Sequence, residues 1–280
     1  MDRETLQEKI KDLARTVDDL LVIDLQQVHG LVDAFGTVRD VELAALDCGV
    51  VPARYARNLG TVGLEGQARL LRATVAVVGL GGLGGYVVEA LARMGVGTLI
   101  LIDGDVFEEH NLNRQLLGTL ENLGIEKAQA ACARVARVNA AVEPICHART
   151  LTEENLPKLL EGADVVVDAL DRLPTRLLLQ DGAQELGIPM VHGSIAGFLG
   201  QVMTILPGDP GLHALYGDGE VLPDQGLEAE LGTPAATPMA VAAWEAQEVV
   251  KLLTDRGEPL RHRLLVLDME TGDSQILQLG

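Results

Sequence analysis

Cysteines, basic side chains and long apolar runs are all scarce in this chain. Its 280 residues include 3 cysteines, and 22 Lys and Arg stand against 41 Asp and Glu, which gives a formal net charge of −19. A chain this acidic repels polyanions, so the charge argues against nucleic acid as the main partner. We interpret the acidity as an aid to solubility, with attraction of a basic partner as the alternative.

The same scarcities predict a cytoplasmic location. Cys48, Cys132 and Cys146 have no short mutual spacing, and the amino terminus has no basic segment followed by an apolar run. These features indicate a reducing compartment and no export. Apolar stretches such as residues 73–83 are interrupted by glycine. They are also shorter than the roughly 20 residues that a membrane-spanning helix needs, so we expect no membrane segment.

The chain has enough apolar sequence for one substantial α/β domain and a small appendage, since 48% of its residues are hydrophobic. Up to about Leu46 the apolar residues recur every three or four positions, which predicts two or three helices. Residues 48–52 are typical of a junction. We therefore divide the chain into a helical N-terminal extension, residues 1–50, and a main domain, residues 51–280.

The main domain alternates between strand and helix patterns, which is typical of an α/β, Rossmann-like fold. Helices join the strands of its first half, so that half of the sheet should be parallel. The strands after Pro189 have too little chain between them for helical crossovers and should be mixed or antiparallel. The expected strands are 74–78, 98–102, 142–146, 164–168, 190–192, 200–206, 264–268 and 274–279, and the expected helices are 84–94, 127–139, 156–160 and 238–253. Residues 207–234, rich in glycine and proline, should form a long loop of the functional or mobile kind.

A glycine-rich loop between the first strand and the first helix of the main domain carries the strongest local signal. Its sequence is Gly-Leu-Gly-Gly-Leu-Gly, and its glycines are Gly79, Gly81, Gly82 and Gly84. Glycine permits the tight turn, the close approach of backbone to phosphate and the close packing of the helix, whose N-terminus then faces an anion. Asp103 ends the next strand, where it can accept hydrogen bonds from a ribose hydroxyl. The set predicts a nucleotide site, and the alternative is a glycine turn that only permits packing.

The residues after the second strand decide between an NAD-dependent oxidoreductase and an enzyme that uses ATP. Arg114 can offer a planar fork of donors to phosphate, and Lys127, at the start of the next helix, offers a compact positive charge. Departure of pyrophosphate needs such neutralisation. Each cation alone is more typical of a solvated surface, but their order in the chain favours an ATP site.

Asp168 and Asp171 follow a buried strand, at the edge where open α/β sheets bind their ligands. We assign Asp171 to Mg²⁺, because this cation prefers carboxylate oxygens and nucleotide phosphates. The alternative is that Asp171 caps the following helix.

A family resemblance emerges when these motifs are set beside others along the chain. The further segments are residues 54–58 (Arg-Tyr-Ala-Arg-Asn), 63–67, 95–97, 102–105, 111–115 (Asn-Leu-Asn-Arg-Gln), Arg176 and 200–201. In this order the motifs resemble the ThiF/MoeB/HesA family of the ubiquitin-activating-enzyme superfamily, from about Arg54 to the C-terminus.

The resemblance implies a homodimeric adenylyltransferase that binds ATP and Mg²⁺. It would activate the C-terminal glycine carboxylate of a ubiquitin-like sulfur-carrier protein ending in Gly-Gly, in thiamine, molybdopterin or related sulfur-cofactor biosynthesis. By motif match the ATP site would contain Asp103, Asp105, Asn111, Arg114, Lys127 and Asp171. Arg57 would reach across the dimer interface, so that the catalytic set is Arg57, Arg114, Lys127 and Asp171.

Two departures from the family pattern concern cysteine. No cysteine follows Cys146, so the Cys-x-x-Cys pairs that bind zinc in many members are missing, and we predict no zinc site. The crossover-loop cysteine that joins some members to their carrier is missing too. We interpret Cys132 and Cys146 as buried small hydrophobes, and nothing near Cys48 suggests a lowered thiol pKa. His192 and His213 receive no role, because no partnered nucleophile or metal cluster accompanies them.

Other functions compete with this interpretation. One is adenylation of a small-molecule or tRNA-linked carboxylate, as in the tRNA threonylcarbamoyladenosine dehydratases, although the acidity counts against tRNA. Another is a non-catalytic ATP-binding module that docks a partner, although the ATP-site residues are complete. An NAD-dependent dehydrogenase is the weakest alternative.

Overall fold

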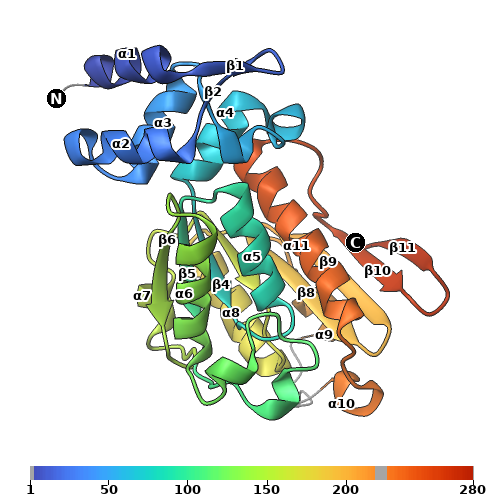
Figure 1. The fold of residues 1–280 in the computed structure, drawn as a ribbon. Helices are drawn as coiled ribbons and strands as arrows, with labels where there is room; N and C mark the ends of the chain where they lie inside the picture. Colours follow the sequence, from blue (N-terminus) through green and yellow to red (C-terminus); the bar gives the residue numbers. More distant parts are fainter. Residues whose placement is uncertain (1–2, 218–225, 280) are drawn as a thin grey trace.

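An 8-stranded sheet runs through the main part of the molecule (Figure 1). The computed structural model describes residues 3–217 and 226–279. The order of the strands is β11-β10-β9-β8-β7-β4-β5-β6. Their bounds are β4 (Thr74–Val78), β5 (Thr98–Ile102), β6 (Glu143–His147), β7 (Val165–Asp168), β8 (Met190–Ala196), β9 (Leu199–Ile205), β10 (Arg263–Asp268) and β11 (Asp273–Gln278).

The sheet changes character across its width. Strands β4 to β8 pair in parallel, whereas β8, β9, β10 and β11 pair antiparallel. This confirms the predicted parallel first half and antiparallel second half. The parallel register places Val78 beside both Ile102 and Asp168. The carboxyl ends of β4, β5 and β7 therefore lie side by side at one edge of the sheet.

Helices cover both faces of the sheet because its central strands are apolar on both sides. Val75 and Val77 of β4 belong to one core, while Ala76 and Val78 belong to the other. Figure 1 shows α5, α6 and α11 in front of the sheet and α7 and α8 behind it. Their bounds are α5 (Gly84–Met94), α6 (Lys127–Val138), α7 (Leu156–Leu159), α8 (Leu173–Glu185) and α11 (Ala236–Thr254).

Helix α4 (Leu59–Arg72) is absent from the predicted elements. Its sequence contains Gly60, Gly63 and Gly66, and Gly63 takes φ 69° and ψ 177° inside it. Glycine weakens the helical pattern and marks a kink here, which explains why periodicity alone missed the helix.

The N-terminal extension is only partly helical, which corrects the prediction. Helices α1 (Arg3–Leu13), α2 (Leu25–Phe35) and α3 (Val38–Asp47) accompany a 3-stranded sheet of β1 (Arg15–Val17), β2 (Leu20–Ile23) and β3 (Val51–Pro52). Asp18 and Asp19 form the turn between β1 and β2, with φ of 48° and 63°. Aspartate tolerates this left-handed conformation, and two such residues suit a tight hairpin.

The extension packs against the amino ends of the parallel strands. Its hydrophobic core includes Leu71 of α4 and Ala141, which precedes β6. Arg39 of α3 donates to the carbonyl of Gly97, and its Nη1 lies 3.2 Å from the Thr98 hydroxyl at the start of β5. In Figure 1 the extension accordingly sits at the end of the sheet where α4 leads into β4.

The predicted long loop contains short helices. They are α9 (His213–Tyr216) and α10 (Glu228–Leu231), while residues 218–225 of this stretch lie outside the described residues. Three 3₁₀ segments, η1 (Ala53–Tyr55), η2 (Glu109–Asn111) and η3 (Leu120–Asn122), complete the fold. Within the described residues, none of the helices combines the length and the apolar character needed to cross a bilayer.

Of the two cysteines interpreted as buried small hydrophobes, Cys132 is buried in the core, but the interpretation is wrong for Cys146 and misses the bond between them. The two form a disulfide between α6 and β6, with their Cα atoms 6.2 Å apart, and Cys146 is exposed. Strand β6 is the edge of the sheet and α6 packs along it, a proximity that a separation of 14 residues does not reveal. Cys48 is a free, half-buried cysteine. Burial raises the pKa of its thiol and outweighs the neighbouring groups that lower it, which agrees with the absence of a lowered thiol pKa.

Candidate active site

A cavity of about 590 Å³ opens at the edge where β4, β5 and β7 end. Such an edge is where open α/β sheets bind ligands, because the loops that leave the strands diverge there. The structure brings most of the predicted site residues into its wall. These are Gly79, Gly81, Gly82, Asp103, Asp105, Arg114, Lys127 and Asp171.

The glycine loop forms one wall of the cavity, and its shape requires glycine. Gly79 has a φ of +90°, and a Cβ there would lie 2.5 Å from the carbonyl oxygen of Ala169. A Cβ on Gly84 would lie 1.8 Å from the carbonyl oxygen of Gly79, so Gly84 closes the turn behind the cavity wall. No side chain caps the N-terminus of α5. This uncapped N-terminal end of the helix, directly behind the glycine loop, suits a phosphate group.

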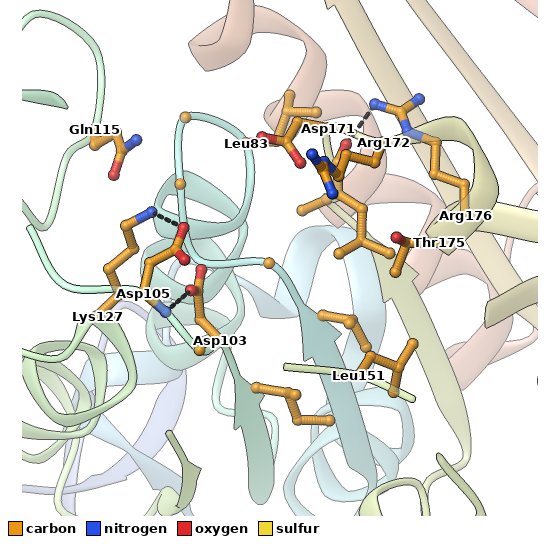
Figure 2. A pocket seen from close by; sticks show the side chains of 18 of the residues that line it. Leu83, Asp103, Asp105, Gln115, Lys127, Leu151, Asp171, Arg172, Thr175 and Arg176 are labelled. Carbon is orange, nitrogen blue, oxygen red and sulfur yellow. Dashed lines mark hydrogen bonds and ion pairs between the residues drawn. The ribbon is translucent and has the colours of Figure 1, made fainter. Parts of the chain in front are cut away.

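Asp103, Asp105 and Lys127 gather on one side of the cavity (Figure 2). The carboxylate of Asp103 accepts from the backbone N–H groups of Leu80, at 2.7 Å, and Asp105, at 2.8 Å. Burial raises its pKa. Each oxygen keeps a second lone pair for a ribose hydroxyl. Lys127 is buried, and its Nζ lies 2.9 Å from Oδ2 of Asp105. Lys127 is therefore not a solvated surface cation.

Arg114 reaches the cavity from the segment that follows η2. Its guanidinium is half-buried, and burial lowers its pKa. A Cβ on Gly82 would lie 3.6 Å from its Cγ, so Arg114 lies directly against the glycine loop. Like Lys127, it is held at the cavity, and the surface-cation alternative is wrong for both.

In the segment 111–115, the structure places Gln115 and not Asn111 at the cavity. Asn111 was predicted in the ATP site but does not line the cavity. Its Oδ1 accepts a hydrogen bond from the backbone N–H of Glu108, and its backbone carbonyl accepts one from the backbone N–H of Gln115. Gln115, which we did not single out, is buried at the cavity, and its Oε1 has no hydrogen-bond partner among the described residues. The signal for Gln115 was its place in the Asn-Leu-Asn-Arg-Gln motif.

Asp171 lies on the opposite side of the cavity from Lys127, next to Arg172 and Arg176 (Figure 2). The alternative that Asp171 caps the next helix is wrong, because α8 has Arg172 at its N-cap and no side-chain hydrogen bond there. The exposed carboxylate of Asp171 faces the cavity and attracts Arg114 electrostatically. Arg149 and Arg172 also line the cavity, and the sequence analysis assigned neither.

The donor set fits ATP with Mg²⁺. Magnesium in nucleotide sites commonly uses one or two carboxylates, with phosphates and water completing its shell. Asp171 offers such a carboxylate, and Arg114, Lys127 and the glycine loop surround the space that phosphates would fill. In the part of the chain that the structure describes, no cluster of three or more His, Cys, Asp or Glu side chains could hold a metal by itself. The expectation that zinc is absent stays a prediction from the cysteine count.

Arg57 lies apart from these residues. It follows η1, its side chain is exposed, and it does not line the cavity of its own chain. The structure therefore does not bring Arg57 to the other predicted catalytic residues within one chain.

The sequence and the fold both match known proteins. The sequence matches the family model described as the ThiF family over residues 55–280. SAMP-activating enzyme E1 of Haloferax volcanii is 42% identical over 222 residues, 77% of this chain and 80% of that protein. Sulfur carrier protein adenylyltransferase of Thermus thermophilus is 40% identical over 225 residues, 77% of this chain and 82% of that protein.

A solved structure of E. coli MccB with ATP superimposes with a TM-score of 0.70 and 23% identity, covering 81% of this chain and 72% of that one. This likeness concerns the fold. Together the comparisons confirm the predicted family, fold class and enzyme class, that of the nucleotidyltransferases. The chain belongs to the ThiF family.

Proposed function

We propose that this protein is an adenylyltransferase that uses ATP and Mg²⁺ to activate the C-terminal glycine carboxylate of a ubiquitin-like sulfur-carrier protein. One observation carries the proposal: a single cavity combines the glycine loop, the cations Arg114 and Lys127, and the carboxylate of Asp171. The names of the relatives from Haloferax volcanii and Thermus thermophilus support the carrier as substrate.

The proposed reaction is a substitution at the α-phosphorus of ATP. A carboxylate oxygen of the carrier forms a bond to the α-phosphorus, the bond from that phosphorus to the bridging oxygen breaks, and pyrophosphate leaves. The products are an acyl-adenylate and pyrophosphate. Bound Mg²⁺ would supply charge neutralisation to the phosphates. Arg114 and Lys127 would bind phosphate oxygens from two sides, and Asp103 would orient the ribose.

This chemistry does not require a general base. A C-terminal carboxylate is already ionised at pH 7, so the site has to position the reactants and neutralise charge. The cavity agrees with this requirement: within the described residues, its wall carries arginines and a lysine but no histidine or cysteine.

We further propose that the protein is a homodimer in which Arg57 completes the partner's site. The exposure of Arg57 and its distance from its own cavity wall support an action in trans. Mixing Arg57→Ala with Asp171→Ala subunits tests this. Since half of the random dimers would regain one intact site, we expect recovery of about a quarter of the wild-type activity. Two subunits that stay inactive after exchange would show that Arg57 does not act in this way.

The test of the proposed function is ATP–pyrophosphate exchange, with and without each small Gly-Gly-terminated carrier. Exchange that requires one carrier is the expected result, and it would also identify the partner. NAD serves as the control ligand, and we expect no saturable binding of it. Tight binding of ATP and Mg²⁺ without exchange for any carrier would contradict the carrier as substrate and favour a small or tRNA-linked carboxylate.

A further inference from the structure

A buried histidine lies beneath the cavity and has no role in the adenylation chemistry. His192 of β8 is fully buried, and its Nδ1 lies 2.7 Å from Oδ2 of Asp168, which is also fully buried at the end of β7. The register of the two parallel strands places the residues side by side. They form a polar pair at the edge of the sheet that carries the site.

The pair connects to the turn that carries Asp171. The second carboxylate oxygen of Asp168 accepts from the N–H of Leu170 at 3.1 Å, and Arg176 donates from Nη2 to the carbonyl of Leu170. The N–H of Ala169 donates to the carbonyl of Val78 in β4. The backbone immediately before Asp171 is thus held by side chains from two elements and by a neighbouring strand.

The same turn touches the glycine loop. The carbonyl of Ala169 occupies the space that a side chain on Gly79 would need, and the Cβ of Ala169 would lie 3.3 Å from a Cβ on Gly84. The phosphate-facing loop and the turn before Asp171 are therefore packed as one block. A shift of the turn would displace the carboxylate of Asp171 relative to the phosphates.

The charge state of the pair follows from its surroundings. Burial lowers the pKa of His192, against the opposing effect of Asp168, so the imidazole is neutral. A neutral imidazole donates from one nitrogen only, and the carboxylate requires that this be Nδ1. The ionisable groups that face the pair are Arg176 from α8 and Glu245 from α11.

The other ring nitrogen of His192 makes histidine a destabilising residue at this position. Nε2 of His192 is buried and has no hydrogen-bond partner among the described residues. A buried polar atom without a partner is destabilising, so an apolar side chain among the neighbouring residues Met190 and Met203 would satisfy packing at lower cost. The donor at Nδ1 is the property that distinguishes histidine from such a side chain.

We propose that His192 is a positioning residue for Mg²⁺ in the bound nucleotide complex. Its Nδ1–H fixes the carboxylate of Asp168, Asp168 then holds the N–H of Leu170, and the held turn aims Asp171 at the cation. This inference rests on the proposed function, since it presumes that the cavity binds ATP with Mg²⁺.

Three variants separate positioning from simple stability. His192→Leu removes the donor, whereas His192→Asn retains an N–H near the position of Nδ1. Thr204→Val is the matched control. The buried hydroxyl of Thr204 on β9 donates to Glu248 on α11 at 2.7 Å, and neither residue lines the cavity. We expect loss of this hydrogen bond to lower the stability about as much as His192→Leu does, without moving the turn before Asp171.

The measurement is the calorimetric titration of each variant with ATP over a range of Mg²⁺ concentrations. We expect His192→Leu to raise the Mg²⁺ concentration for half-maximal ATP binding about tenfold or more, since outer-shell partners of metal ligands have effects of this size. ATP affinity without Mg²⁺ should stay unchanged. His192→Asn and Thr204→Val should each stay within about twofold of the wild type.

The possible results discriminate clearly. If the wild type and a folded His192→Leu variant show the same dependence of ATP binding on Mg²⁺ concentration, this inference alone is overturned. If ATP binding to the wild type does not depend on Mg²⁺, the proposed function is overturned as well. If His192→Leu does not fold, Asp168→Ala and Asp168→Asn replace it. Asparagine still accepts from Leu170, so only the alanine variant should shift the Mg²⁺ curve; equal curves for the two would overturn the inference.

Discussion

Polar groups at the amino ends and at the carboxyl ends of the parallel strands differ in their partners. At the amino ends, polar groups are paired within the protein: Arg39 of the N-terminal extension donates to the carbonyls of Gly97 and Ala141, and Arg54 pairs with the buried Glu42 of the extension. At the carboxyl ends, the exposed carboxylate of Asp171 faces the cavity, and the buried amide oxygen of Gln115, another residue of the cavity wall, has no hydrogen-bond partner among the described residues. These groups at the first end serve the fold, whereas Asp171 and the amide oxygen of Gln115 at the second end are left for a ligand.

Two buried glutamates show the same difference in energetic terms. Glu42 has Arg54 within 3.4 Å, whereas neither carboxylate oxygen of Glu245 has a hydrogen-bond partner among the described residues. Glu245 lies on α11 against Gly193, one residue beyond His192. Burial raises the pKa of both carboxyls. The pKa of Glu245 is raised well above its ordinary value, and the negative charge of Asp168 adds to the effect of burial there, whereas Arg54 opposes burial at Glu42. Oε2 of Glu42 also lacks a hydrogen-bond partner among the described residues, so the two glutamates differ in the cation that lies beside Glu42.

The largest expected effect comes from comparing the two ends of β7. Asp171→Ala should lower ATP–pyrophosphate exchange by at least about 100-fold, because a ligand for the phosphate-bound cation is lost. Its thermal unfolding should match the wild type. The matched control is Asp164→Ala at the start of the same strand, where the carboxylate accepts from the N–H of Thr74 at 2.8 Å. That variant should lose only about 1 kcal/mol of stability and no activity. Equal losses of activity in the two variants would contradict a functional role for Asp171 beside a purely structural role for Asp164.

The next effect concerns stability at the amino end. Arg54→Met leaves Glu42 buried without its cation, and Arg54 also donates to Asn139. Removing one partner of a buried ion pair costs about 3 kcal/mol, or less here since Arg54 is partly exposed. Urea unfolding should report this loss while ATP binding stays within about twofold. A large loss of ATP affinity with unchanged stability would show that Arg54 serves ATP binding and not the stability of the fold.

Glu245→Gln probes the unpaired group at the other end and should stabilise the protein. With its pKa raised far above the ordinary 4.5, Glu245 holds a proton in the folded state that the unfolded chain releases. Wild-type stability therefore falls as the pH rises from about 4.5 towards the folded pKa. Glutamine removes this dependence, so the gain should grow with pH and reach roughly 1–3 kcal/mol at pH 8. Urea unfolding at pH 5 and pH 8 measures it, and a gain independent of pH would contradict the account.

The smallest expected effect is at Cys48. Burial raises the pKa of this thiol, and the side chain lies beside the extension's core, away from the cavity. Cys48→Ser should leave carrier-dependent exchange unchanged, and alkylation of the wild type at pH 7.5 should be slow. Loss of exchange after either treatment would show that adenylation depends on this residue.

The sequence predicted those parts of the site that local patterns encode. The strands at 74–78 and 98–102, the glycine loop and Asp103 follow from short-range spacing, and the structure places them together. The pairing of Cys132 with Cys146, the hairpin at Asp18 and the displacement of Asn111 by Gln115 depend on contacts or turns that such spacing does not encode. His192 belongs to this second group, because its partner Asp168 lies on a neighbouring strand.

The most direct test of the central claim is the intact mass of a Gly-Gly-terminated carrier after incubation with the protein, ATP and Mg²⁺. The account predicts a carrier that gains one AMP at its C-terminal carboxylate with the wild type and with Asp164→Ala, but not with Asp171→Ala. An unmodified carrier in the presence of wild-type protein that binds ATP and Mg²⁺, or an adduct formed equally well by Asp171→Ala, would contradict it.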